Sequence, residues 1–292
     1  MIEIPAAAVL ARNIDIVQDV GSLRARLAAW RRTGEAIGLI PTMGALHAGH
    51  ISLLRKAKRY ARRAVVSIFV NPAQFAPSED FAAYPRSLEK DMALIEAAQG
   101  DLVFAPCVEE MFAEGFATAI NVAGPAAAGL EDRFRPTHFA GVALIVAKLF
   151  NQCRPDFAIF GEKDFQQLKV VERMARDLDF ELQILSAPTV RETDGLALSS
   201  RNIYLAAEER ARAPLLYAAL SISVSAIKEG VPISRALELG RAMLNEAGFA
   251  VDYFEARHAE SLKPIALQGD GPLRLLAAAR LGRTRLIDNL AV

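Results

Sequence analysis

The chain has 292 residues, a length typical of about two ordinary domains. Its composition, 52% hydrophobic and 23% charged, is that of a globular protein and excludes a disordered, collagen-like or coiled-coil chain. Because 34 basic residues balance 34 acidic residues, the net charge of zero excludes a global field that would attract nucleic acid or an anionic membrane.

The first two thirds of the sequence alternate short apolar runs with helical patterns. A first amphipathic helix is predicted because Leu23, Leu27 and Trp30 recur at helical spacing after Ser22, a possible N-cap. Strands are predicted over residues 36–40, 64–70, 101–104, 156–160 and 181–185, with helices such as 51–63 between them. This alternation predicts an α/β domain over residues 1–188, built on a Rossmann-like, doubly wound parallel sheet with helices on both faces.

The pattern changes after about residue 188. Residues 206–228 and 234–247 predict helices, and residues 251–258, 273–280 and 285–292 predict strands. These elements predict a second, smaller α+β domain over residues 189–292.

Three features predict a cytoplasmic protein. The first residues, Met1 to Leu10, contain Glu3 and no basic residue, so we expect no secretory signal peptide. The longest apolar stretch, 139–150, is shorter than the roughly 20 residues of a membrane-spanning helix, so no membrane span is expected. The only two cysteines, Cys107 and Cys153, are too few for a disulfide framework or a cysteine zinc site, and we expect both thiols to be buried.

The strongest motif lies where a predicted strand meets the next helix. Pro41 to His50 has the sequence Pro-Thr-Met-Gly-Ala-Leu-His-Ala-Gly-His, which places His47 and His50 on one face of a first helical turn. The amides and dipole of such a turn favour an anion, Gly44 and Gly49 allow a phosphate to come close, and imidazolium groups would add positive charge. We therefore predict phosphate binding. A zinc site would need a third ligand, and the Walker A and G-x-G-x-x-G patterns are absent.

Two further segments follow predicted strands, and ligands of parallel sheets bind beyond the carboxyl ends of the strands. In Gly161 to Asp164, the lysine suits a phosphate and the last aspartate a ribose hydroxyl. Leu198 to Arg201 offers two hydroxyls and a guanidinium. A solvated helix start and a helix cap are the alternative interpretations. The neutral amides of Gln74 and Gln167 suit a small hydroxy acid, because they leave its carboxylate reactive.

Taken together, seven segments resemble the pantothenate synthetase family, and the resemblance spans both predicted domains. The segments are Pro41–His50, Ile68–Phe75, Tyr84–Arg86, Arg135–Gly141, Gly161–Gln167, Val190–Arg191 and Gly195–Asn202. The His-x-Gly-His motif is also similar to that of nucleotidyltransferases and class I aminoacyl-tRNA synthetases. The resemblance implies a homodimer that joins pantoate to β-alanine using ATP and Mg²⁺. The reaction would proceed through a pantoyl adenylate and release pyrophosphate and AMP, with the C-terminal domain acting as a lid.

The resemblance also implies roles for individual residues. The ATP site would comprise Met43, Gly44, Ala45, Leu46, His47, Ala48, Gly49, His50, Gly161, Glu162, Lys163, Asp164, Val190, Leu198, Ser199, Ser200 and Arg201. The catalytic residues among them would be His50, His47, Lys163, Ser199, Ser200 and Arg201, while Gln74 and Gln167 would bind the pantoate and β-alanine substrates. No metal ligand is assigned, since Lys90 precedes Asp91 where other members carry two acids. Leu198 stands where some members have Met.

Other functions and one loop remain open at this point. A nucleotidyltransferase acting on a phosphorylated small molecule and a non-catalytic nucleotide sensor are the alternatives. A tRNA synthetase is disfavoured because no basic anticodon-binding region follows the first domain. The segment Gly124 to Pro136, with Glu131 and Arg135, is predicted to be a loop that either covers the site against water or simply connects two elements in solvent.

Overall fold

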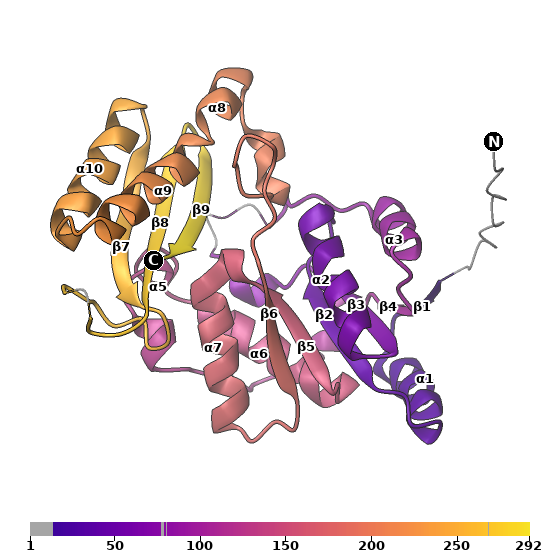
Figure 1. Cartoon of the computed structure of the whole chain (residues 1–292). Coiled ribbons are helices and arrows are strands. Elements are labelled where there is room, and N and C mark those ends of the chain that lie inside the picture. The colour runs from indigo at the N-terminus through magenta and orange to yellow at the C-terminus, as the bar shows by residue number, and fades with distance from the viewer. Residues whose placement is uncertain (1–13, 77–78, 80, 268) are drawn as a thin grey trace, which may run out of the picture.

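The computed structural model describes residues 14–76, 79, 81–267 and 269–292, so Met1 to Leu10, where no signal peptide is expected, lie outside the described residues (Figure 1). Six parallel strands form the main sheet in the order β1-β4-β3-β2-β5-β6. The strands are β1 (Asp15–Val17), β2 (Ile37–Thr42), β3 (Arg63–Ile68), β4 (Leu102–Phe104), β5 (Phe157–Gly161) and β6 (Gln183–Ala187). This sheet confirms the predicted doubly wound α/β fold.

Helices cover both faces of this sheet. They are α1 (Val20–Arg32), α2 (Ala48–Tyr60), α3 (Leu88–Ala97), α4 (Val108–Met111), α5 (Glu131–Phe134), α6 (His138–Cys153) and α7 (Phe165–Asp177), with 3-10 turns η1 (Pro72–Gln74), η2 (Gly124–Ala127) and η3 (Glu162–Asp164). Side chains alternate along each strand, so Leu39 and Val65 pack with α1, α6 and α7, whereas Ile40 and Val66 pack with α2 and α3. Both faces of the sheet are therefore buried, as the apolar runs predicted.

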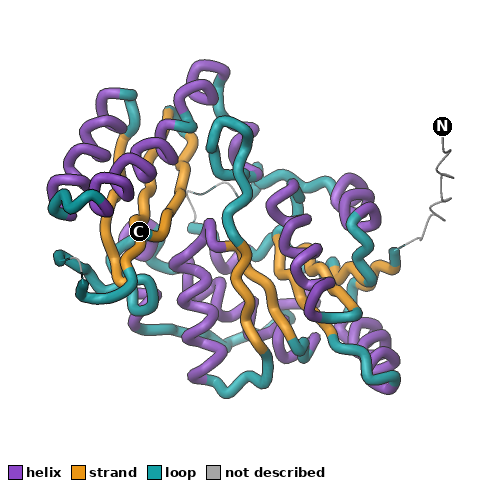
Figure 2. The backbone as a smooth tube through the Cα atoms, in the orientation of Figure 1, coloured by secondary structure: helices purple, strands orange, loops and turns teal. Residues whose placement is uncertain are grey.

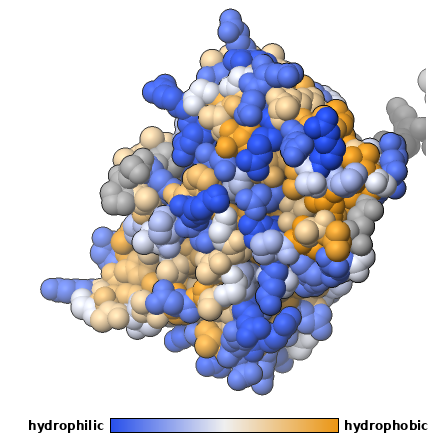
Figure 3. All heavy atoms as spheres, turned by 90° about the vertical axis from the view of Figure 1, so that its left-hand side faces the viewer, coloured by the Kyte–Doolittle hydropathy of each residue, from blue (hydrophilic) through white to orange (hydrophobic). Residues whose placement is uncertain are grey.

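A separate antiparallel sheet forms the C-terminal unit (Figure 2). It contains β7 (Ala250–His258), β8 (Leu273–Leu281) and β9 (Thr284–Ala291), and it packs against α9 (Leu215–Lys228) and α10 (Ile233–Glu246). Before it come η4 (Ser200–Tyr204) and α8 (Ala207–Arg212). Seen from this unit, the surface intersperses hydrophilic and hydrophobic residues (Figure 3). No helix in the described part of the chain is long and apolar enough to cross a membrane.

Three local predictions were wrong. The N-cap of α1 is Asp19, whose carboxylate accepts the backbone N–H of Ser22 at 2.7 Å, so Ser22 already lies inside the helix. The helix predicted over 206–228 is two helices, because Pro214 has no N–H to continue the first. The thiol of Cys107 is exposed rather than buried, since it stands at the N-terminus of α4.

Candidate active site

Helix α2 begins with two histidines that are bonded back to the backbone. The Nδ1 of His47 accepts from the N–H of Gly49 at 3.1 Å, and the Nδ1 of His50 accepts from the N–H of His47 at 3.3 Å. The centroids of the two rings lie 4.1 Å apart. Because each Nδ1 accepts a hydrogen bond, a neutral ring carries its proton on Nε2, so both histidines can offer an Nε2–H donor.

Both histidine rings are neutral at pH 7. Burial, with help from the nearby Lys163, lowers the pKa of His47 to about 4. Burial, followed by the effects of His47 and Lys163, lowers the pKa of His50 to about 3. The expectation that imidazolium groups supply positive charge is therefore wrong for the free protein, and the fixed cation beside the rings is Lys163.

The turn before these histidines is held by a buried carboxylate. Gly44 and Ala45 have left-handed φ angles of 79° and 51°. The backbone N–H groups of Ala45 and Leu46 donate to the two oxygens of Asp91 at 3.0 and 2.7 Å. Asp91, in α3, is only 2% exposed. Its oxygens thus stabilise a strained turn, and Asp91 lines neither of the two cavities described below.

The side-chain amide of Gln74 is held by Asn71, which is itself bonded to Gly141. Both residues lie in the sequence segments named above, but no role was predicted for them. The Oε1 of Gln74 accepts from the Nδ2 of Asn71 at 3.1 Å, and the same Nδ2 donates to the carbonyl of Gly141 at 3.1 Å. A Cβ on Gly141 would lie 2.2 Å from the carbonyl oxygen of Ala73, so only glycine allows α6 to pack this closely on η1. The Nε2 of Gln74 faces the sulfur of Met43 at 2.9 Å.

The turn that carries Lys163 follows β5 and is held from behind by β9. The side-chain amide of Asn289 donates to the carbonyls of Glu162 and Lys163, both at 2.9 Å. The carboxylate of Glu162 accepts from Ser186 at 2.8 Å and Arg274 at 3.1 Å, so it faces away from the cavity. Within the described residues, no hydrogen bond or ion pair engages the Lys163 ammonium or the Asp164 carboxylate.

The loop that carries the two serines is anchored to the same strand. Arg191, near its start, forms two bonds to the carboxylate of Asp288 at 2.5 and 2.8 Å and lies 4.0 Å over the ring of Tyr217. Further along the loop, the hydroxyls of Ser200 and Tyr84 are 3.3 Å apart. Strand β9 therefore contacts both the lysine turn and the serine loop, through the neighbouring residues Asp288 and Asn289.

These segments enclose an inner cavity of about 210 Å³. Of the residues predicted for the site, it is lined by Met43, His47, Gly49, His50, Gln74, Gly161, Lys163, Asp164, Gln167, Val190, Leu198, Ser199, Ser200 and Arg201. Gly44, Ala45, Leu46, Ala48 and Glu162 do not line it. Its apolar wall was not predicted; it includes Phe69, Val142, Ile145, Val146 and Leu149. The residues that α6 contributes to this wall could not be predicted from the sequence, because that helix is apolar on nearly every side.

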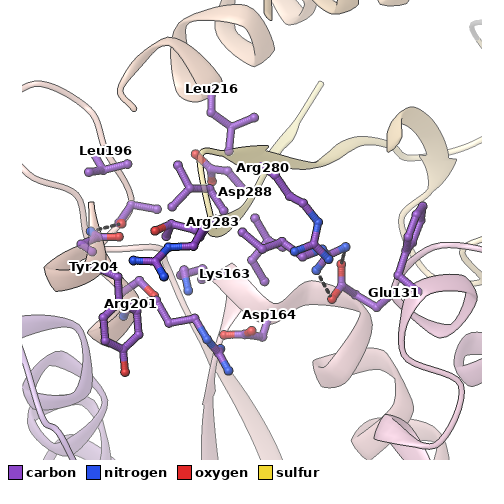
Figure 4. Close-up of a pocket in the computed structure, with 18 of the residues that line it drawn as sticks. Glu131, Lys163, Asp164, Leu196, Arg201, Tyr204, Leu216, Arg280, Arg283 and Asp288 are labelled. Carbon is purple, nitrogen blue, oxygen red and sulfur yellow. Dashed lines mark hydrogen bonds and ion pairs between the residues drawn. The ribbon is translucent and has the colours of Figure 1, made fainter. Parts of the chain in front are cut away.

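An outer cavity of about 340 Å³ adjoins the inner one and shares Lys163, Asp164, Ser199 and Arg201 with it. Arginines from β8, β9 and the turn between them line its other side (Figure 4). Glu131 and Arg135 also line it. Glu131 is only 7% exposed and binds the guanidinium of Arg285 at 2.7 and 2.8 Å, so the segment 124–136 is a wall of this cavity and not a simple solvent-exposed connection.

The free energy of unfolding is expected to fall as the pH is lowered from about 7.5 to 5.5. Burial lowers the pKa of His47 to about 4 and that of His50 to about 3. Burial, aided by Arg135, also lowers the pKa of His138 to about 4. Below the ordinary histidine pKa of 6.5, the unfolded chain binds protons that the folded chain excludes, so stability present at neutral pH is lost. Urea unfolding followed by circular dichroism measures this.

One variant sharpens that measurement. Replacing His138 with glutamine should reduce the loss of stability over this pH interval. An unfolding free energy that stays constant between pH 7.5 and 5.5 would contradict the neutral state of the buried rings.

Comparison with known proteins was consistent across sequence and structure. The family model described as pantoate-beta-alanine ligase matches residues 15–291. The chain is 57% identical to pantothenate synthetase 2 of Bradyrhizobium diazoefficiens over 97% of this chain and 100% of that protein. A crystal structure of pantothenate synthetase from Thermus thermophilus has a TM-score of 0.90 at 48% identity, covering 95% of this chain and 99% of the other. The pantoate-beta-alanine ligase of Francisella tularensis, solved with beta-gamma ATP and beta-alanine, has a TM-score of 0.79 at 31% identity, covering 95% and 97%.

Proposed function

The chain belongs to the pantoate-β-alanine ligase family, and we propose that it joins pantoate to β-alanine with ATP through a pantoyl adenylate. A carboxylate cannot be aminated directly at neutral pH, because oxide or hydroxide would have to leave. Adenylation converts that oxygen into part of AMP, a good leaving group. The enzyme is thus proposed to release pyrophosphate in the first step and AMP in the second.

One observation carries this proposal: side chains suited to phosphate and side chains suited to a small acid come from separate segments and line the same inner cavity. His47 and His50 come from the start of α2, Lys163 from the turn after β5, and Ser199 to Arg201 from the start of η4. The Gln74 amide faces the same space. A neutral amide binds hydroxyl and carboxylate oxygens without quenching a carboxylate nucleophile.

The first step forms one bond and breaks one at the α-phosphorus. A carboxylate oxygen of pantoate forms the new P–O bond, and the electron pair of the bond to the β-phosphate leaves on pyrophosphate. The proposed role of the chain is to position the reactants and neutralise charge, with Nε2–H donors of His47 and His50 and the ammonium of Lys163 on phosphate oxygens. No covalent bond to the protein is needed.

The second step takes place at the activated carboxyl carbon. The free amine of β-alanine adds to this carbon, the bond between the carbon and the bridging phosphate oxygen breaks, AMP leaves with the electron pair, and the nitrogen loses a proton to water. Water would compete with the amine for the adenylate, so a site walled by Phe69, Val146 and other apolar side chains favours ligation over hydrolysis.

The residues present suit a magnesium ion that is bound mainly by phosphate. Mg²⁺ typically takes one or two carboxylates, water and substrate phosphate oxygens. The carboxylate of Asp164 lines both cavities and has no hydrogen-bond or ion-pair partner among the described residues, so it would hold the ion. No cluster of three metal-binding side chains occurs in the described part of the chain, which agrees with a site completed by substrate. Bound magnesium would neutralise phosphate oxygens.

The decisive experiment is exchange of labelled pyrophosphate into ATP. We expect exchange that requires pantoate and proceeds without β-alanine, and AMP release once β-alanine is added. A nucleotidyltransferase would instead leave the nucleotide on its acceptor, and a sensor would bind ATP tightly without exchange. The homodimer implied by the family resemblance and the cytoplasmic location predicted from the sequence stay predictions.

A further inference from the structure

We propose that the outer cavity binds the pyrophosphate group, and that the turn between β8 and β9 supplies its distal ligands, Arg283 and Arg280. This inference rests on the proposed function, since it concerns the group that leaves ATP in the first step. As the bond between the α-phosphorus and the bridging oxygen breaks, that oxygen takes the electron pair, and the departing group gains a negative charge that needs a cationic surface.

The first argument is the charge balance of the outer cavity. Among the residues that the structure describes, the basic side chains that line it outnumber the acidic ones: Arg135, Lys163, Arg201, Arg280, Arg283 and Arg285 face Glu79, Glu131, Asp164 and Asp288. Three of these acids are already held by arginines, Glu79 by Arg135, Glu131 by Arg285 and Asp288 by Arg191. Of the described lining, Lys163, Arg280 and Arg283 then stand against Asp164, so this surface is positive and suits a polyanion more than a neutral or singly charged ligand.

The second argument is that Arg283 and Arg280 are available to bind a ligand. Arg283 lies in the turn and extends into the cavity on the side of Lys163 (Figure 4). Among the residues that the structure describes, none pairs with its guanidinium. In the described part of the chain, the ion-pair contact of Arg280 is a long one, 3.9 Å to Asp252. Both guanidinium groups can therefore reach a phosphate without breaking a strong ion pair.

A buried hydroxyl beside them adds independent support. Thr284 lines the same cavity and is 4% exposed, yet its Oγ1 has no hydrogen-bond partner in the described part of the chain. A buried hydroxyl without a partner is costly, and it points to a ligand or an ordered water that completes it.

The two cavities adjoin each other where the reaction is proposed to occur. Lys163, Asp164, Ser199 and Arg201 line both, so a pyrophosphate group that leaves the inner cavity keeps part of its surroundings as it moves outward. Arg280 and Arg283 then extend the cationic surface beyond the inner cavity. Their predicted effect is on pyrophosphate and on the outer phosphates of ATP, and not on pantoate.

Isothermal titration of the full-length protein with inorganic pyrophosphate tests the proposal directly. We expect Arg283→Ala to weaken binding by about threefold and the double variant Arg280→Ala, Arg283→Ala by about tenfold, as suits exposed charge-assisted contacts. Arg283→Lys should retain most of the affinity. The KM for pantoate should stay unchanged in all of them.

A matched control separates local binding from overall charge. Arg235, on α10, is exposed and does not line either cavity, so Arg235→Ala removes the same charge far from the site. The proposal is overturned if the double variant binds pyrophosphate as the wild type does, or if Arg235→Ala weakens binding equally. Since this titration needs no turnover, its failure is distinct from an absence of pantoate-dependent exchange, which would contradict the proposed ligase reaction.

Discussion

Replacing His50 with alanine is expected to lower the rate of pantoate-dependent exchange of pyrophosphate into ATP by about 10² to 10³, the usual cost of removing one preorganised donor to developing charge. The ring is fixed before any ligand arrives, because its Nδ1 accepts the N–H of His47. Its pKa of about 3 keeps it neutral, so its Nε2–H is a donor throughout the physiological range. Alanine removes this donor and also releases the amide of His47.

Binding of pantoate should change much less than the exchange rate, because the glutamine amides that are proposed to hold it do not touch His50. The control is His258→Ala, the same substitution at a histidine that does not line either cavity. Near-normal exchange by both His47→Ala and His50→Ala would show that these rings do not contact phosphate. A further check is the acid side of the profile of kcat/KM, which should show no histidine with a pKa near 6.5.

The parallel sheet and the loops of the site could be predicted from the sequence, because both depend on local patterns. Short apolar runs such as 64–70 alternate with helical stretches, and this spacing leaves little choice but a sheet covered on both faces. A motif directly after such a run must lie at the carboxyl edge of the sheet. For this reason the amino-acid pattern alone places Pro41 to His50 and Gly161 to Asp164 on one edge.

Properties that depend on distant residues could not be predicted. The charge of His50 follows from how deeply the folded chain buries it, which no local pattern reports. Asp91 binds the amides of Ala45 and Leu46 from a helix more than 40 residues further along the chain. A signal did exist for β9, where Asp288 and Asn289 interrupt an apolar strand, and both are less than 5% exposed. Adjacent buried polar residues in a strand require partners, but the sequence does not name them.

The second large effect on the rate is expected for Asn289→Ala, because Asn289 holds the turn that carries Lys163. The amide of Asn289 is the donor to the carbonyls of Glu162 and Lys163, and its Oδ1 accepts from Arg274 at 2.6 Å. Without it, the turn that presents the Lys163 ammonium loses two of its restraints. A displacement of about 1 Å at a positioned group can cost about 10²-fold in rate, so we expect kcat to fall by about 10 to 100-fold.

Because Asn289 acts through Lys163, the pattern of the loss matters more than its size. Asn289→Asp keeps the shape and the bond to Arg274 but cannot donate to the two carbonyls, so it should lose kcat as Asn289→Ala does while the KM for pantoate stays near normal. Asn245→Ala, at an exposed position of α10, should change neither. Equal losses in kcat, pantoate KM and melting temperature would indicate that Asn289 only stabilises the fold. If instead Asn289→Asp had wild-type kcat, the restraint on the lysine turn would have to come from another contact, such as the one between Glu162 and Arg274.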